Sequence, residues 1–141
     1  NRIDIGNICH ALLAQIRTVA DIDGAINHFV ERGIIDSEEK KIKVRNLIHE
    51  SWNYLCKEHW FNACYDEVLC EQAFLDDKQE LRPDRVMIKG NRVIILDYKF
   101  GKQNEKYIDQ INKYIHLFKQ MGYNDVHGYI WYAQDKMMIK V

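Results

Sequence analysis

The stretch that decides the fold reads DRVMIKGNRVIILDYK and runs from Asp84 to Lys99. Two runs rich in β-branched and apolar residues flank Gly90-Asn91, a pair that accepts the positive φ angles of a tight hairpin. A loop of these two residues predicts the cross-strand pairs Lys89 with Arg92, Ile88 with Val93, Val86 with Ile95, and Asp84 with Asp97.

The open end of this hairpin gathers charged side chains on one face. Because side chains alternate along a strand, Asp84, Asp97 and Lys99 share a face that is otherwise apolar. Facing carboxylates repel one another, and burying them is costly unless something neutralises them. Lys99 does part of this, and a hard divalent cation such as Mg²⁺ or Mn²⁺ would do it better. From the spacing alone, a surface hairpin end with a loose Asp–Lys pair fits equally well.

Pro83-Asp84, followed by Asp97-Tyr98-Lys99, resembles the signature of the PD-(D/E)xK nucleases. The Asp-Tyr-Lys form is similar to the RecB/AddA branch, the nuclease domain at the end of bacterial helicase–nucleases that process double-strand breaks. The resemblance implies that Asp84, Asp97 and Lys99 are catalytic. It also implies that Asp84, Asp97 and the backbone carbonyl of Tyr98 bind Mg²⁺ or Mn²⁺.

The amino-terminal segment offers a further metal ligand. A helix is predicted from Ile5 to about Val19, and its apolar stripe consists of Ile5, Ile8, Leu12 and Ile16. His10 lies roughly 130° from the centre of that stripe, where a lone histidine is usually a surface residue. However, Gly6-x-x-x-His10 resembles the element that supplies an imidazole metal ligand at the start of RecB-type nuclease domains. The resemblance favours His10 as a ligand.

Glu71 lies in a strand predicted from Glu67 to Leu75, which a polar connector of residues 76–80 follows. Glu71-x-Ala-Phe resembles the Glu-x-x-Phe strand that precedes the catalytic hairpin in AddA and RecB relatives. Glu71 would bind a second metal ion, directly or through water, or would anchor a nearby basic residue. We prefer the second role.

A strong helix is predicted from Glu105 to Met121. Gln110 and Tyr114 are four residues apart and therefore lie on one side of it. Gln110-x-x-x-Tyr114 resembles the motif that distinguishes the RecB-type branch, where it holds DNA or positions catalytic groups. The pair alone would equally suit a tyrosine at the edge of the core beside a chance glutamine.

Shorter patterns complete the chain. They predict helices over residues 25–32 and after a cap at Asp36 or Ser37, and strands over 126–132 and 137–141. With the hairpin and the later helix they suit an α/β fold. The resemblance implies a restriction-endonuclease-like core, a mixed β-sheet flanked by helices, with residues 1–141 as a single domain.

The composition and net charge limit the classes of protein to which this chain can belong. A chain of 141 residues with 47% hydrophobic and 29% charged residues suits one folded domain. The formal charge of −1 gives no global positive field, which weighs against an autonomous DNA-binding protein more than against a catalytic domain fed by a larger assembly. No apolar run or signal-peptide pattern indicates a membrane or secretion, so we expect a cytoplasmic protein. The resemblance implies that it is bacterial.

Four cysteines, Cys9, Cys56, Cys64 and Cys70, form no CxxC pair, which argues against zinc. Some relatives in the wider family carry an iron–sulfur cluster with three cysteines beyond the Gln-containing helix. No cysteine follows Cys70 here, so no cluster is expected.

The resemblance implies a metal-dependent deoxyribonuclease, with exonuclease action favoured, in double-strand-break processing and recombinational repair. The abrupt start at Asn1 and the lack of a phosphate-binding loop suggest a fragment that receives single-stranded DNA ends from a helicase domain of its parent chain or complex. The alternative is a non-catalytic DNA-guiding or protein-docking module that kept the fold. The sequence does not distinguish one metal ion from two.

Overall fold

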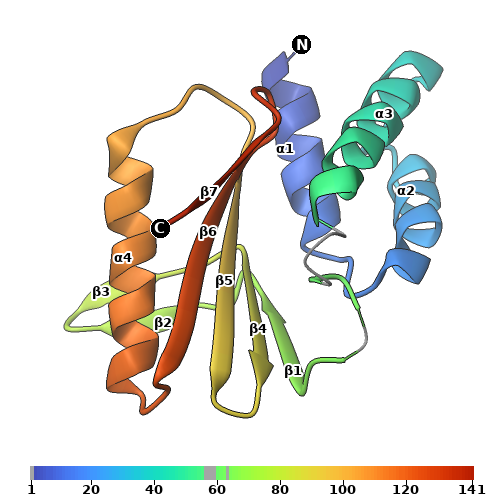
Figure 1. Cartoon of the computed structure of the whole chain (residues 1–141). Helices are drawn as coiled ribbons and strands as arrows, with labels where there is room; N and C mark the ends of the chain where they lie inside the picture. The colour runs from blue at the N-terminus through green and yellow to red at the C-terminus, as the bar shows by residue number, and fades with distance from the viewer. Residues whose placement is uncertain (1, 56–59, 63) are drawn as a thin grey trace. The chain divides into compact units, whose positions relative to one another are not determined.

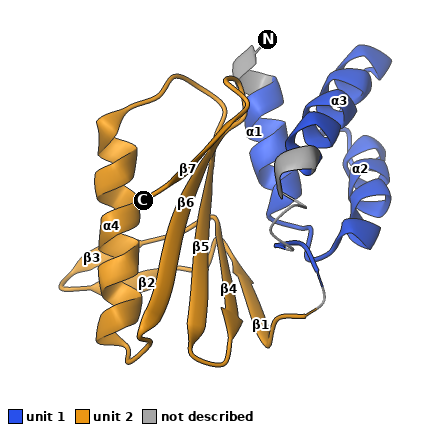
Figure 2. Cartoon of the chain, in the orientation of Figure 1, with its two compact units in different colours: residues 1–63 blue, residues 64–141 orange. Residues whose placement is uncertain are grey.

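The computed structural model describes residues 2–55, 60–62 and 64–141. The chain divides into two compact units, residues 1–63 and residues 64–141 (Figure 2). The interpretation of the whole chain as one nuclease domain stays a prediction. In the described ranges, every helix is too short or too polar to cross a lipid bilayer.

The first unit is built from helices. Its elements are α1 (Arg2–Leu13), the short 3₁₀ helix η1 (Val19–Asp21), α2 (Ile22–Glu31) and α3 (Glu38–Leu55) (Figure 1). Of the two caps predicted for α3, Asp36 and Ser37, it is Ser37 whose Oγ accepts the Lys40 backbone N–H, at 3.1 Å. The second helix begins earlier than predicted, so Gly24 lies inside it.

The first helix ends at Leu13, well before the predicted end near Val19. Beyond it, the N–H groups of Gln15 and Ile16 donate to carbonyls only three residues back, which tightens the chain out of the α-helix. The Asp21 carboxylate then accepts two backbone N–H groups from the residues before it and fixes a separate turn. The predicted stripe is nevertheless buried, at Ile5, Ile8, Leu12 and Ile16.

The second unit contains a five-stranded mixed sheet in the order β1-β4-β5-β6-β7. Its strands are β1 (Glu67–Cys70), β4 (Arg85–Lys89), β5 (Arg92–Lys99), β6 (Asp125–Tyr132) and β7 (Met137–Lys140). Only β5 and β6 pair in parallel, and α4 (Glu105–Gln120) connects them. The α/β class and the mixed sheet are confirmed.

The hairpin register is also confirmed. The strands β4 and β5 pair Lys89 with Arg92, Ile88 with Val93, and Val86 with Ile95. Gly90 has φ +58°, as the two-residue turn requires.

The predicted strand from Glu67 to Leu75 is wrong, because Glu71 adopts a left-handed backbone with φ +52° and ends β1. The chain then forms a separate ribbon of β2 (Phe74–Asp76) and β3 (Gln79–Leu81). The predicted polar connector is the turn of that ribbon, since both of its central residues, Asp77 and Lys78, have positive φ.

The helix α4 packs on one face of the sheet. Asn104 caps it by accepting the Lys106 backbone N–H at 3.0 Å. Its buried side chains join those of β4 and β5 in one core, which includes Val86, Ile88, Val93, Ile95, Ile111, Tyr114 and Phe118. Since Val86, Ile88, Val93 and Ile95 point to this face, strand alternation places Asp84, Asp97 and Lys99 on it too.

Cysteine side chains take little part in this core. Cys9, Cys64 and Cys70 are free thiols, and Cys56 lies outside the described residues. Burial raises the pKa of Cys9 to about 12, so that thiol is unreactive at neutral pH.

Replacing Gly128 with alanine should destabilise the protein by about 1–3 kcal/mol. A Cβ there would lie 2.4 Å from Ile111 Cγ2, in the buried contact between β6 and α4. Gly24→Ala is the matched control, because a Cβ at that helical position meets nothing within 4 Å and helix propensity favours alanine. Urea unfolding measures both, and equal stability of Gly128→Ala and the unsubstituted protein would contradict this packing.

Candidate functional site

Two aspartates, Asp84 and Asp97, form hydrogen bonds across the open end of the hairpin. The Asp84 backbone N–H donates to Asp97 Oδ1 at 2.9 Å, and the Tyr98 backbone N–H donates to Asp84 Oδ2 at 2.8 Å. Each carboxylate therefore accepts a backbone hydrogen bond from the opposite strand. The two residues therefore meet at the hairpin end, one residue beyond Arg85–Leu96, the last strand pair of the β4–β5 ladder.

Both carboxylates are buried, with Asp84 8% and Asp97 2% exposed. Burial, followed by the charge of Asp84, raises the pKa of Asp97 to about 6. Lys99 and the hydrogen bond from the Asp84 backbone act in the opposite direction. The pair thus carries excess negative charge at neutral pH, which a cation would relieve.

Lys99 lies where the pattern predicts. Its Nζ is 3.5 Å from Asp97 Oδ2 and 4.4 Å from the centroid of the Tyr107 ring. It also donates to Gln110 Oε1 at 3.3 Å. The ammonium is thus held between a carboxylate of β5 and two side chains of α4.

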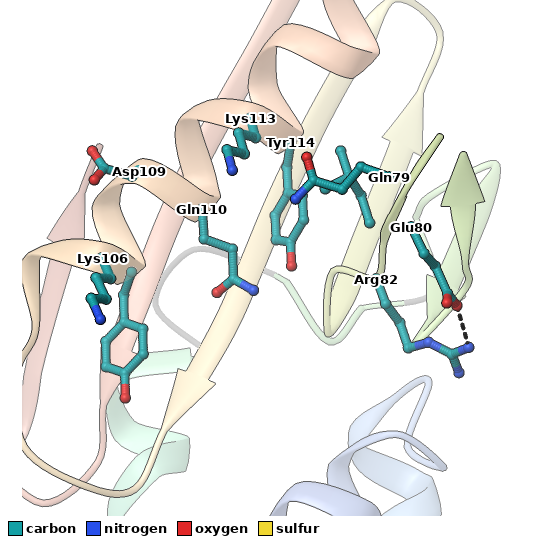
Figure 3. A pocket seen from close by; sticks show the side chains of 10 residues that line it. Gln79, Glu80, Arg82, Lys106, Asp109, Gln110, Lys113 and Tyr114 are labelled. Carbon is teal, nitrogen blue, oxygen red and sulfur yellow. Dashed lines mark hydrogen bonds and ion pairs between the residues drawn. The ribbon is translucent and has the colours of Figure 1, made fainter. Parts of the chain in front are cut away.

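Gln110 and Tyr114 belong to this site, as the helical spacing predicts (Figure 3). The Tyr114 side chain is buried in the core. Burial, followed by the charges of Asp97 and Asp84, raises its pKa, while hydrogen bonds from the Arg82 backbone and the Gln110 side chain partly offset this. Gln110 thus accepts from the Lys99 ammonium and lines the same pocket as Tyr114.

Glu71 also lies beside the aspartates. Its backbone N–H donates to the Asp84 carbonyl at 3.0 Å, and one of its carboxylate oxygens lies within 4.8 Å of one from Asp84. The left-handed backbone at Glu71 produces this approach. The hydrogen bond and charge of Glu80 raise the pKa of Arg82, and the charge of Glu71 adds to this last. The role of Glu71 stays a prediction.

The Tyr98 carbonyl is the expected backbone ligand. The N–H and C=O groups of a strand residue point to the same edge, and the Tyr98 N–H points to Asp84. The register places Pro83 opposite Tyr98, and a proline has no N–H to donate to that carbonyl.

His10 is half-buried on α1, in the other compact unit. Its role as a metal ligand stays a prediction.

Sequence reasoning missed Tyr107 and the basic residues near the site. Tyr107 precedes Gln110 by three residues, so helical spacing alone could have placed it beside Lys99. Arg82, Lys106 and Lys113 line a pocket with Gln110. Only the fold of the β2–β3 ribbon brings Arg82 to that helix, and no local pattern predicts it.

This arrangement of buried carboxylates beside one lysine can bind a hard cation and place an ammonium next to it. Comparison of the chain with models of protein families and with curated proteins found no match.

Asp97→Asn should stabilise the protein in chelator at pH 8, by up to roughly 3 kcal/mol. The folded pKa of Asp97, about 6, exceeds its ordinary value of 3.8. The folded state therefore binds the proton more tightly, and stability falls as the pH rises from about 4 to 6. Asparagine has no carboxyl group to ionise, so the variant does not lose stability as the pH rises. Its side-chain oxygen can still accept the Asp84 N–H.

Thermal unfolding from pH 4 to 8 tests this, and the stability advantage of the variant should grow between about pH 4 and pH 6 and then level off. Asp109→Asn, an exposed change on α4, is the control and should change stability by less than about 0.5 kcal/mol. A less stable Asp97→Asn at pH 8 would mean that the Lys99 ion pair outweighs the burial of charge.

Proposed function

We propose that this chain is a metal-dependent deoxyribonuclease of the PD-(D/E)xK type, similar to the RecB/AddA branch, with a restriction-endonuclease-like core. One observation carries the proposal: Asp84 and Asp97 meet across the hairpin end, and Lys99 stands 3.5 Å from Asp97. The contact from Lys99 to Gln110 supports it, because it links the two motifs of the resemblance.

Asp84 and Asp97 would hold Mg²⁺ or Mn²⁺ through their carboxylate oxygens, with the Tyr98 carbonyl as the backbone ligand that the resemblance implies. The cation would supply polarisation of the scissile phosphate and acidification of a water molecule. Lys99 Nζ orients that water or offsets charge on the pentacovalent transition state. Gln110 holds Lys99 in position, and Tyr114 steadies the DNA strand.

The substrate in this proposal is DNA, with single-stranded ends cut as by an exonuclease. The chain would act in double-strand-break processing and recombinational repair in the bacterial cytoplasm. A helicase domain of the same chain or complex would deliver the strand, which suits a domain with a formal charge of −1.

One observation favours a second function, a non-catalytic DNA-guiding or docking module. Both aspartates already accept backbone hydrogen bonds, and Asp97 has an ion pair with Lys99. A purely structural role would need no more than this.

Asp97→Ala and Lys99→Ala should each reduce Mn²⁺-dependent cutting of single-stranded DNA by at least about 100-fold, because one removes a metal ligand and the other the transition-state cation. Lys89→Ala, an exposed lysine at the turn end of β4, is the control and should keep full activity. Gel analysis of labelled DNA with purified protein measures cutting. Circular dichroism checks that each variant folds. Equal cutting by either site variant would refute its role.

His10 enters the proposal from the sequence alone, as an imidazole ligand. We expect His10→Ala to raise the Mn²⁺ concentration needed for half-maximal cutting by at least about tenfold. His49→Ala, an exposed histidine of α3, is the control. An unchanged Mn²⁺ requirement in His10→Ala would remove His10 from the ligand set and leave the two aspartates untouched.

A further inference from the structure

A pocket of about 550 Å³ lies between the β3 end and α4 (Figure 3). One wall comes from the segment Gln79–Arg82, and the other comes from the first half of α4 between Lys106 and Tyr114. Its volume is in the range of sites that hold one small ligand.

The two walls are fixed to each other. Leu81 of the first wall and Tyr114 of the second are buried side by side in the same hydrophobic core. The pocket is therefore part of the folded unit rather than a gap beside a loose ribbon.

Its lining carries three basic side chains, Arg82, Lys106 and Lys113, and two carboxylates, Glu80 and Asp109. Lys106 and Lys113 lie four residues before and three residues after Gln110, so both flank it on one face of the helix. Arg82 belongs to the other wall, and its guanidinium points toward Glu80, with which it pairs at 2.7 Å. Both of these side chains are more than half exposed, so an incoming phosphate can take the guanidinium at little cost.

The pocket is directly connected to the candidate site. Gln110 lines the pocket and accepts from Lys99 Nζ at 3.3 Å, and Lys99 is 3.5 Å from Asp97. Tyr107 also lines it and adds a half-buried aromatic ring. Two side chains, Gln110 and Lys99, therefore connect a ligand seated there to Asp97.

We propose that this pocket binds one nucleotide of a single DNA strand, next to the nucleotide whose phosphate lies at the aspartates. Arg82, Lys106 and Lys113 take the phosphate, and Tyr107 takes the base or sugar. The identity of the ligand rests on the proposed function. The size of the pocket suits one unstacked nucleotide and not a duplex.

Binding of a fluorescent oligothymidylate to the whole 141-residue chain tests this. The measurement is anisotropy in chelator, so that no strand is cut. We expect Lys106→Ala and Lys113→Ala each to weaken binding about 3- to 10-fold and to reduce the salt dependence by about one phosphate contact. Lys119→Ala, exposed on the same helix outside the pocket, should bind as the unsubstituted chain does.

Equal binding by Lys106→Ala, Lys113→Ala and the control would overturn the pocket assignment, as would no measurable binding by the unsubstituted chain. Equal affinity for the matching duplex would overturn the single-strand preference. Cutting in Mn²⁺ is measured separately. Pocket-dependent binding without cutting refutes the nuclease and supports the pocket, whereas cutting without pocket-dependent binding does the reverse.

Discussion

The site depends on a reciprocal pair of hydrogen bonds at the open end of one hairpin. Asp84 donates its backbone N–H to the carboxylate of Asp97, and its own carboxylate accepts from the backbone of Tyr98. Like charges brought together in a buried place would normally separate. Here the backbone holds them, because each hydrogen bond partly compensates the loss of water around a carboxylate.

These hydrogen bonds compensate only part of the lost hydration of the carboxylates. The pKa of Asp97 shows this, because burial still raises it to about 6. Lys99 supplies one positive charge at 3.5 Å and is itself held by Gln110 and the ring of Tyr107. Two buried carboxylates that repel each other but are held in place are suited to a bound cation. The cation relieves the repulsion without moving the side chains. The nuclease proposal depends on this property.

The sequence predicted what local chemistry determines. The Gly90-Asn91 turn set the register, the alternation set the faces, and the i, i+4 spacing placed Gln110 with Tyr114. It failed where one residue departs from the regular pattern. The left-handed backbone of Glu71 divided a predicted strand, and the turn at Asp77 and Lys78 made a ribbon from an expected connector. The pocket follows from that ribbon, so no local pattern could have shown it.

The central claim is that the paired carboxylates of Asp84 and Asp97 bind a divalent cation. A crystal soaked in Mn²⁺ above pH 7, with anomalous diffraction recorded, tests it most directly. The account predicts an anomalous peak at coordinating distance from both carboxylates. A peak elsewhere, or none, with Asp97 still paired to Lys99, would contradict it.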